Sequence, residues 1–265
     1  MSERSERRPV PFRGGGFAPA PRRILPWIVF FALITLWQAA SSAGLLPPLF
    51  MPSPATIVRA LVELWLNGTL VEHITASLKR IIPGWIIGTA AGLAVGLAMG
   101  IFSAARSAGL PVVSALFPIP KIALLPLLIL WFGIGEPSKV ATIALGVFFP
   151  TVISAYSACD SVPRNLIRMG QSFGLPATDI VAKVILPGSM PGILAGFRIS
   201  ASVALLLVVA AEMIGAQYGI GAFVLAAGNL MQTDQLMAGV VMLSVLGLLI
   251  AWGLGMVERS VLRWR

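Results

Sequence analysis

The sequence contains few of the residues that enzyme active sites use. Only 11% of its 265 residues are charged, and it has a single cysteine, Cys159, and a single histidine, His73. An average soluble domain has roughly 25% charged residues. One cysteine excludes an internal disulfide, and one histidine leaves little for a metal site or a catalytic triad. We therefore expect neither catalytic residues nor a metal site in this chain.

The sequence also has too few polar side chains to cover a soluble fold. Hydrophobic residues make up 57% of it, and its mean hydropathy is +0.92. A bilayer accepts an apolar exterior, and it favours helices because each helix satisfies its own backbone hydrogen bonds. These values predict an all-α polytopic membrane protein, in which lysine and arginine first indicate topology rather than nucleic-acid binding.

The N-terminal part combines a basic tail with a first span. Residues 1–23 hold six arginines among glycine and proline, which predicts a disordered tail on the cytoplasmic side. The apolar run within residues 24–44 is long enough to cross a hydrocarbon core of about 30 Å. A signal peptide cleaved near Ser41, Ser42 and Ala43 is the alternative, but this run exceeds the usual hydrophobic region of such a peptide.

The remaining chain divides into an outer segment, a membrane core and a short tail. We assign residues 45–81 to an extracytoplasmic segment whose amphipathic helix places Ile57, Leu61, Leu64 and Trp65 on one side. Residues 82–258 form a core of five transmembrane helices, and residues 259–265 form a cytoplasmic tail. The five core spans are expected at about 82–102, 110–132, 138–158, 192–214 and 236–257.

Small residues recur at every fourth position in two of the predicted spans. In a membrane, such stripes let neighbouring helix backbones approach closely, because lipid offers no hydrophobic drive for helix association. The candidates for helix packing are Gly84, Gly88, Gly92, Gly96 and Gly100 in the second span, and Gly192, Gly196, Ser200 and Ala204 in the fifth.

The distribution of lysine and arginine predicts the orientation. Six spans put both termini on the same side, where thirteen basic residues then lie, against four on the other side. Cytoplasmic segments carry such an excess of positive charge. We therefore expect both termini and the loop at 160–190 in the cytoplasm. The four outer basic residues are Arg59, Lys79, Arg80 and Lys139, and we expect Lys79 and Arg80 at the outer interface.

The third predicted span is interrupted by proline. Pro118, Pro120 and Pro126 each remove a backbone donor and bend or break a helix. Irregular backbone at membrane depth is tolerated only where protein or water covers it, so this span is expected to face a pathway. The candidates for a translocation pathway are Lys121, Pro126, Arg198 and Glu212.

The three charged candidates have alternative roles. Lys121 either attracts an anionic substrate or pairs with Glu212 or a backbone carbonyl, since a charge at membrane depth costs at least about 2.5 kcal/mol on insertion scales. Arg198 is interpreted first as a side chain that extends to lipid phosphate. Glu212, toward the outer end of the fifth span, forms either a gate or a structural ion pair.

Residues 168–188, RMGQSFGLPATDIVAKVILPG, are a polar interval between apolar spans. Apolar residues before Gly174 share one helical face, and Gly174 ends that helix as a left-handed cap would. A second short amphipathic helix starts at Pro176 and ends at Leu186-Pro187. Three interpretations of this bent pair stay open: a helix lying on lipid headgroups, a DNA-binding helix-turn-helix, and a knob that fits a cytoplasmic partner. The short tether makes DNA docking the weakest of the three.

This interval resembles the EAA loop of binding-protein-dependent ABC importer permeases. The shared pattern is Gly174, nine residues, Val184, one residue, and then Leu186-Pro187. The resemblance implies a loop that couples the chain to an ATPase. Its residues would be Arg168, Met169 and Gly170, which stand where the family pattern has Glu-Ala-Ala, together with Phe173, Gly174, Val184, Leu186 and Pro187.

Longer stretches resemble the nitrate, sulfonate and taurine permeases within this family. They are IALLPLLILWFGIGEPSKV at 122–140, LPGSMPGILAGFRIS at 186–200 and VVAAEMIGAQYGIG at 208–221. The resemblance covers roughly residues 50–260. It implies the MetI-like permease fold of a type I ABC importer, with six transmembrane helices in the bacterial inner (plasma) membrane.

The resemblance also implies partners. The sequence contains no G-x-x-x-x-G-K-[ST] motif and hence no phosphate-binding loop of its own, so the energy must come from another chain. We expect two cytoplasmic ABC ATPases, a periplasmic or lipid-anchored substrate-binding protein, a second permease copy that makes a homodimer, and membrane lipid. ATP and Mg²⁺ would then be bound by the ATPase, with no cofactor in this chain, no enzymatic activity and no nucleic-acid partner.

The implied function is the import of a small anion by alternating access. Taurine or an alkanesulfonate is the favoured cargo, and nitrate, bicarbonate or a pyrimidine vitamin precursor are the alternatives. A self-sufficient secondary transporter that uses Lys121 and Glu212 as coupling charges is the rival mechanism, although the sequence shows no inverted pair of similar halves. An intramembrane protease is disfavoured because no Ser/His or paired Asp constellation lies at membrane depth.

Overall fold

The computed structural model of the protein describes residues 24–264, which form helices and connecting turns with no strand among them. The tail predicted at residues 1–23 lies outside this range. The chain divides between Ile57 and Val58 into two compact units. The all-α fold class predicted from composition is confirmed.

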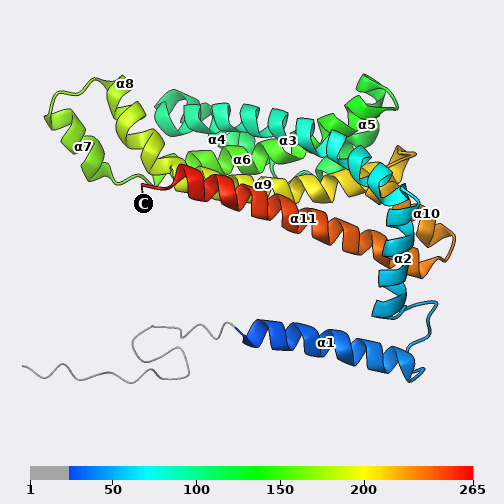
Figure 1. The fold of residues 1–265 in the computed structure, drawn as a ribbon. Helices are drawn as coiled ribbons and strands as arrows, with labels where there is room; N and C mark the ends of the chain where they lie inside the picture. The colour runs from blue at the N-terminus through cyan, green and yellow to red at the C-terminus, as the bar shows by residue number, and fades with distance from the viewer. Residues whose placement is uncertain (1–23, 265) are drawn as a thin grey trace, which may run out of the picture. The chain divides into compact units, whose positions relative to one another are not determined.

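The first unit contains α1, Leu25–Ser42, an 18-residue helix that is long and apolar enough to cross a membrane (Figure 1). Pro26 lies in its first turn, where the missing N–H removes no helical hydrogen bond. None of the side chains of α1 is buried. An apolar surface on all sides is typical of a helix that faces lipid.

The short helix α2, Pro54–Leu66, runs across the division between the units. Ser53 caps its start, because its Oγ accepts a hydrogen bond from the Thr56 N–H at 3.2 Å. Ile57 and Leu64 are buried, as the amphipathic pattern predicted, but Trp65 is exposed. The sequence analysis placed Trp65 on the wrong side, since a residue adjacent to Leu64 points about 100° away from it around a helix.

The second unit is built around α6, Glu136–Asp160, which packs against both α3, Thr69–Ile101, and α9, Leu186–Gly215 (Figure 1). Ile143, Val147 and Val152 of α6 have no exposed surface. These residues occupy different faces of the helix, so α6 is enclosed by its neighbours rather than by lipid. α3, α6 and α9 therefore form one packed layer with α6 at its centre.

Glycines make this packing possible. A Cβ atom at Gly92 of α3 would lie 2.6 Å from the Phe148 carbonyl oxygen of α6, and one at Gly96 would lie 2.6 Å from that of Val152. Side chains at these positions would push the helices apart, so α3 and α6 are held backbone to backbone. Gly84, Gly88 and Gly100 of α3, and Gly192 and Gly196 of α9, also face α6 at distances that leave no room for a Cβ atom.

α3 is longer than the sequence analysis expected. It has 33 residues and starts at Thr69, directly after Gly68, whose φ of +80° breaks the preceding turn. The helix continues through residue 82, where the sequence analysis expected the membrane span to begin, because nothing between Thr69 and Pro83 interrupts it, and a membrane helix tolerates Pro83 itself. At 1.5 Å per residue the helix is about 50 Å long and exceeds the hydrocarbon core. A part of α3 must therefore lie outside the hydrocarbon core, which agrees with the polar side chains in its first turns.

The proline-rich span is broken, as predicted, but at one point only. α4, Ser103–Leu116, meets a second helical piece, Lys121–Phe132, at an angle of 86°. Pro111 lies inside α4 without breaking it, whereas Pro118 and Pro120 occupy the connection. The second piece consists of the 3₁₀ turn η1, Lys121–Leu124, and α5, Leu125–Phe132.

The second short helix of the polar interval does not end at Leu186-Pro187 before the fifth span, which corrects the sequence analysis. Helical structure is continuous from Ala177 to Gly215, and Pro187 lies in the first turn of α9. The preceding turn, Val181–Ile185, is a π-helix in which the Leu186 N–H donates to the Val181 carbonyl oxygen, five residues back. Because Pro187 has no N–H to donate, a widened turn accommodates it without ending the helix.

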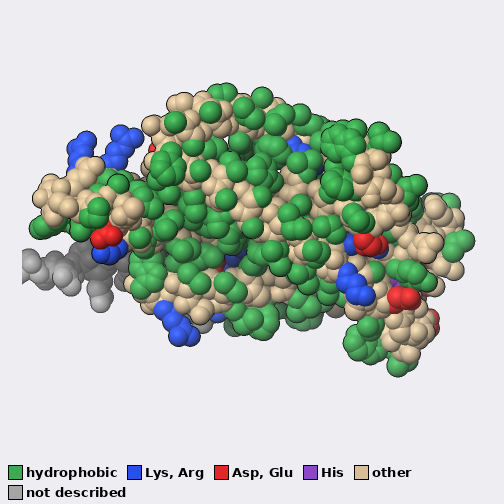
Figure 2. All heavy atoms as spheres, turned by 90° about the horizontal axis from the view of Figure 1, so that it is seen from above, with side chains coloured by type: hydrophobic (Ala, Val, Ile, Leu, Met, Phe, Trp, Pro, Cys, Tyr) green, Lys and Arg blue, Asp and Glu red, His purple; other side chains and the backbone are tan. Residues whose placement is uncertain are grey.

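Two more helices complete the second unit. α10, Ile220–Asn229, is a short apolar helix that the sequence analysis did not assign, and α11, Thr233–Val261, is the last span. Within residues 24–264 there are five helices that could each cross a membrane, or six spans if the bent pair counts as one. Hydrophobic side chains cover most of the face seen in Figure 2, and most of the charged ones lie toward its two ends.

Candidate functional site

The predicted coupling loop is a helical hairpin with a defined reversal. α7, Arg164–Ser172, ends in a Schellman motif: the Leu175 N–H donates to the Gly170 carbonyl oxygen at 3.1 Å, and the Gly174 N–H donates to that of Gln171 at 2.9 Å. Gly174 has a φ of +70°, where a residue with a Cβ atom is strained. The chain then enters α8, Ala177–Ile180.

The two arms of the hairpin touch at Gly170. This residue is buried, and a Cβ atom there would lie 3.3 Å from Cγ1 of Ile180. The apolar side chains on either side of Gly170 are open, since Met169 is exposed and 79% of Phe173 is exposed. A large apolar side chain held out on a braced helix is typical of a contact surface for another molecule.

The other predicted coupling residues lie on both arms. Arg168 is exposed on α7. Val184 lies in the π turn, and Leu186 and Pro187 start α9, so all three are half-buried where the hairpin joins the membrane helix. Movement of the hairpin would therefore be transmitted to α9 without an intervening flexible loop.

An ion pair connects α4 to the same end of the bundle. Nη1 of Arg106 lies 3.0 Å from Oδ1 of Asp160, which is the last residue of α6, and the guanidinium lies 5.1 Å from the centroid of the Tyr156 ring. Both charged side chains are nearly half exposed, so the pair contributes only about 0–1 kcal/mol. It nevertheless fixes where the first turn of α4 meets the segment leading to α7.

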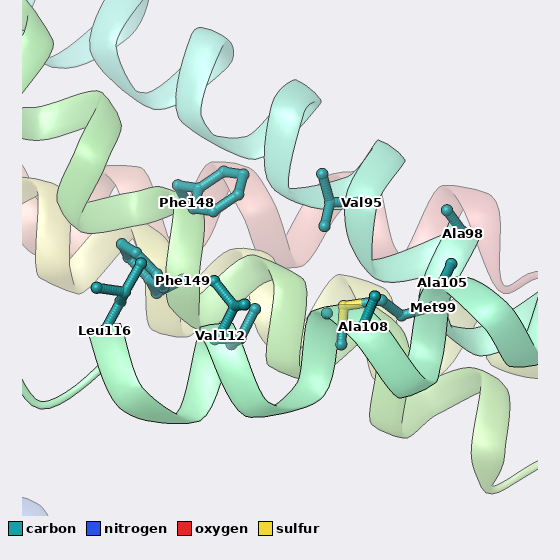
Figure 3. Close-up of a pocket in the computed structure, with 11 residues that line it drawn as sticks. Val95, Ala98, Met99, Ala105, Ala108, Val112, Leu116, Phe148 and Phe149 are labelled. Atoms are coloured by element: carbon teal, nitrogen blue, oxygen red, sulfur yellow. The ribbon is translucent and has the colours of Figure 1, made fainter.

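A pocket of about 410 Å³ lies between α3, α4 and α6 (Figure 3). Its lining includes Met99, Val113 and Phe149, and no charged side chain is among its lining residues. Ligand sites combine apolar walls with a few polar groups that fix orientation. This pocket lacks such groups, so it offers nothing that would recognise an anion.

Lys121 lies at the bend after α4. Its ammonium group is 4.5 Å from the centroid of the Phe149 ring and donates three hydrogen bonds of 2.6–2.9 Å, which uses every donor that a lysine has. Of the alternatives left open by the sequence, the structure shows the carbonyl contact, and Glu212 belongs to a different cluster. The three acceptors are the carbonyl oxygens of Leu116, Phe117 and Ile119.

Arg198 and Pro126, two further pathway candidates, take no part in the hydrogen bonds of Lys121. Nη2 of Arg198 on α9 is 2.5 Å from Oε2 of Glu258 on α11, a carboxylate partner that the sequence analysis did not name. The sequence could not reveal this pairing, because the two residues belong to different spans. Pro126 is exposed in the first turn of α5, where it disturbs no helical hydrogen bond.

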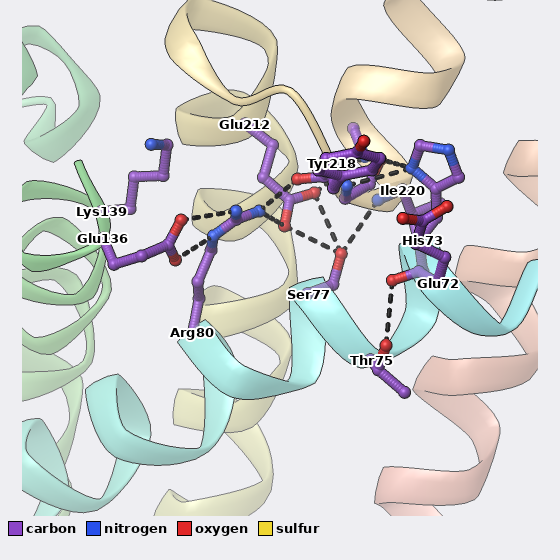
Figure 4. Close-up of polar contacts among 12 residues, drawn as sticks. Glu72, His73, Thr75, Ser77, Arg80, Glu136, Lys139, Glu212, Tyr218 and Ile220 are labelled. Carbon is purple, nitrogen blue, oxygen red and sulfur yellow. Dashed lines mark hydrogen bonds and ion pairs between the residues drawn. The ribbon is translucent and has the colours of Figure 1, made fainter. Parts of the chain in front are cut away.

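A cluster of polar side chains lies at the end of the second unit opposite the hairpin (Figure 4). Arg80 of α3 is its centre: Nε and Nη2 donate to the two carboxylate oxygens of Glu136 at 2.6 and 2.7 Å, and Nη1 donates to Oε1 of Glu212 at 2.7 Å. The guanidinium thus joins α3 to the first turn of α6 and the last turn of α9. We call this set, with the residues of the next paragraph, the Arg80 network.

The rest of the Arg80 network fixes the turn between α9 and α10. Ser77 donates to the Glu212 carboxylate at 2.8 Å and accepts from the Ile220 N–H at 2.9 Å, while the Gly221 N–H donates to the same carboxylate. Nδ1 of His73 lies 3.0 Å from the Gly219 nitrogen. Nη1 of Arg80 also donates to the Tyr218 carbonyl oxygen at 2.7 Å.

Burial explains why the Arg80–Glu212 pair in this network must be complete. Glu212 has no exposed side-chain surface and Arg80 has 5%, so each charge depends on the other and on the surrounding donors. Gly219, with a φ of +135°, lies so close to the Glu212 carboxylate that no Cβ atom would fit. Within residues 24–264, no group of three or more His, Cys, Asp or Glu side chains is placed to hold a metal ion.

The sequence analysis expected Arg80 at an outer interface and Glu212 in a gate or an ion pair, but it did not predict that they meet. They are separated by 132 residues, and no periodic pattern links such distant positions. Glu136, Ser77 and His73 were not proposed as partners either. The sequence did contain one signal: Arg80, Glu136 and Glu212 each lie near an end of a predicted span, and those three ends were predicted on the same side of the membrane.

The fold and the two ends of the bundle define a membrane-embedded transport subunit with a protruding helical hairpin. The chain belongs to the family described as the binding-protein-dependent transport system inner membrane component, whose family model matches residues 88–263. It is therefore a MetI-like ABC importer permease, integral to the inner membrane, and members of this family are not themselves enzymes.

Curated relatives and solved structures agree with this assignment. The taurine transport system permease protein TauC of Escherichia coli K12 is 36% identical over 88% of this chain and 86% of its own length. SsuC of the same strain, named for aliphatic sulfonates transport, is 36% identical over 91% and 92%. A chain of the inward-facing MetNI methionine ABC transporter matches 73% of this chain and 96% of its own length, with a TM-score of 0.63 and 23% identity, and so has the same fold.

Proposed function

We propose that this chain is the membrane channel of an ATP-driven importer for taurine or an alkanesulfonate, and that it works by alternating access. The observation that carries the transport role is the α7–α8 hairpin, braced at Gly170 and Gly174 and presenting Phe173 at one end of the bundle. The cargo is inferred from the two relatives named for taurine and aliphatic sulfonates transport. Another relative, RibX of Chloroflexus aurantiacus, is 32% identical and named for riboflavin transport, so the family alone does not fix the cargo.

The proposed assembly contains two copies of this chain, two cytoplasmic ATPases that bind ATP and Mg²⁺, and a periplasmic or lipid-anchored binding protein. In this proposal the α7–α8 hairpin and both termini lie in the cytoplasm, which is supported by the excess of lysine and arginine on that side of the chain. The Arg80 network then lies on the outer side. Its turn between α9 and α10 is rigid and contains the exposed side chain of Tyr218, which suits it to receive the binding protein.

The mechanism follows from how the helices are joined. A displacement of the hairpin moves α9 directly, because helical structure is continuous from Ala177 to Gly215. α6 ends at Asp160, shortly before the hairpin begins. Because glycine contacts pack α6 tightly on α3, these two helices move as one body. Closing of the ATPases would thus be converted into tilting of the whole layer.

The test is to co-express the chain with its neighbouring ATPase and binding protein, reconstitute the complex in proteoliposomes, and measure ATP turnover with different anions. Taurine or ethanesulfonate is expected to accelerate turnover several-fold, with nitrate, bicarbonate and riboflavin having smaller effects. Acceleration by one of those three would replace the proposed cargo. Uptake driven by an ion gradient without the ATPase would overturn the proposed mechanism.

A further inference from the structure

The contact between Arg80 and Glu136 has a role that packing does not explain. α3 and α6 are already fixed against each other by glycine contacts from Gly84 to Gly100. The Glu136 side chain is 60% exposed, and an ion pair with such an exposed partner contributes only about 0–1 kcal/mol. Holding the two helices together is therefore done by other residues.

Arg80 contacts its buried partner, Glu212, through Nη1 alone, on one side of the guanidinium. Nη1 donates to Glu212, which has no exposed surface, and to the Tyr218 carbonyl oxygen. Nε and Nη2 form the other edge of the guanidinium, and this edge carries the two short hydrogen bonds to Glu136. A carboxylate that accepts two parallel bonds offers the same pair of oxygens that a sulfonate group would offer.

The net charge around this edge of the guanidinium would be balanced by one anion. Lys139 follows Glu136 by three residues on α6, so both side chains start from the same face of the helix. Lys139 is only 5% exposed, and within the described residues its ammonium group donates to the Gly135 carbonyl oxygen alone. When Glu136 turns away, Arg80, Lys139 and Glu212 together leave one excess positive charge, which a singly charged anion would balance.

Glu136 can leave without unfolding anything. It is the first residue of α6 and follows Gly133 and Gly135, of which Gly133 has a φ of +83°. Because 60% of its side chain is exposed, a rotation of that side chain is enough to free the guanidinium edge.

We propose that the Nε/Nη2 edge of Arg80 binds the anionic group of the transported sulfonate, and that Glu136 occupies this edge as an internal substitute until the substrate arrives. Lys139 supplies the second positive charge. The proposal rests on the proposed function, because it takes the imported sulfonate as its ligand. The site is on the side where the binding protein would release that anion.

The test measures binding without transport. The full chain is purified in detergent micelles, and its thermal unfolding midpoint is followed as sodium ethanesulfonate is added, with sodium chloride at equal ionic strength as the reference. Ethanesulfonate is expected to raise the midpoint in the native protein. In Glu136→Gln, which removes the competing charge but keeps the size, the half-saturating concentration is expected to be about two- to fivefold lower.

Matched variants separate this site from a structural ion pair. Glu72→Gln removes an exposed carboxylate on α3 that does not contact Arg80. Its unfolding midpoint is expected to respond to ethanesulfonate like that of the native protein. Lys139→Gln is expected to lose most of the response, and if it does not fold, the comparison of Glu136→Gln with Glu72→Gln decides alone. An unchanged half-saturating concentration in Glu136→Gln, or an equal response to chloride, would show that the pair is structural only.

The two proposals fail separately. If sulfonates accelerate ATP turnover in the complex while Glu136→Gln binds ethanesulfonate no better than the native chain, the importer stands and this site is wrong. If ethanesulfonate stabilises the chain as expected but no sulfonate accelerates turnover, the anion site stands and the assigned cargo is wrong.

Discussion

Gly92 of α3 lies directly against the carbonyl oxygen of Phe148 in α6, at a distance that admits a hydrogen atom but no methyl group. Gly88 and Gly96 repeat this relationship with other carbonyl oxygens of α6, and Gly84 and Gly100 lie equally close to its side chains. In lipid, where apolar surfaces gain little from meeting one another, such close backbone contact is the main source of helix association. The pair α3–α6 is therefore the rigid part of the transporter layer.

A methyl group at this contact is expected to destabilise the protein. Gly92→Ala should lower the free energy of unfolding by about 1–3 kcal/mol, because the two helices must separate to make room. Thermal unfolding in detergent measures the effect. The control is Gly253→Ala in α11, where no atom lies within 4 Å of the added Cβ. Equal midpoints for the two variants would contradict the packing argument.

The exposed aromatic side chain of the hairpin should matter for assembly and not for folding. Phe173→Ala is expected to weaken association with the ATPase by about 30-fold, the effect of losing a contact worth about 2 kcal/mol. Co-purification and titration of the ATPase against the permease measure this. Leu230→Ala, which shortens an exposed apolar side chain at the opposite end of the unit, is the control and should leave the affinity unchanged. Undiminished binding by Phe173→Ala would argue against the hairpin as the docking surface.

The buried ion pair should be sensitive to the loss of one partner. Glu212→Gln leaves Arg80 without its buried counter-charge and is expected to cost about 3–5 kcal/mol. Glu258→Gln, which removes the partly exposed partner of Arg198, should cost about 0–1 kcal/mol. Chemical unfolding of both variants supplies the comparison. The double variant Arg80→Met/Glu212→Leu is expected to recover part of the loss, and no recovery would mean that Ser77 and the backbone donors are the more important partners.

Lys121 is expected to hold the bend by closing off three carbonyl oxygens. Without its ammonium group, Lys121→Met should raise amide hydrogen exchange at Phe117 and Ile119 about tenfold or more, because bonds to a charged donor are each worth about 1.5–3 kcal/mol. Lys79→Met, at an exposed position of α3, is the control. Exchange that stays at the native rate would show that Pro118 and Pro120 maintain the bend unaided.

Local rules predicted the features that depend on neighbouring residues. The spacing of glycines predicted the face on which α3 packs, and Gly174 predicted the left-handed end of α7, since both follow from the geometry of a single helix. Proline predicted where the bent span is irregular. The rule failed at Pro187, because a proline in the first turn of a helix can be absorbed by a wider turn before it.

The Arg80 network was beyond such rules. Arg80, Glu136 and Glu212 come from three helices, and only the packing of those helices brings them together. Lys121 shows a related limit. A charge at membrane depth predicts that the side chain has a partner, but the sequence does not identify that partner. α10 was missed for a different reason: with 10 residues it is too short for the length test that identifies spans.

The Arg80 network also constrains how the chain is made. Synthesis delivers Arg80 first, Glu136 only 56 residues later and Glu212 after 132 residues. Until α9 has been synthesised, the guanidinium of Arg80 lacks its buried counter-charge, and until Ile220 and Gly221 follow, the Glu212 carboxylate and the Ser77 hydroxyl lack the backbone donors of the turn before α10. The network can therefore form only late in synthesis, when α11 alone is still to come.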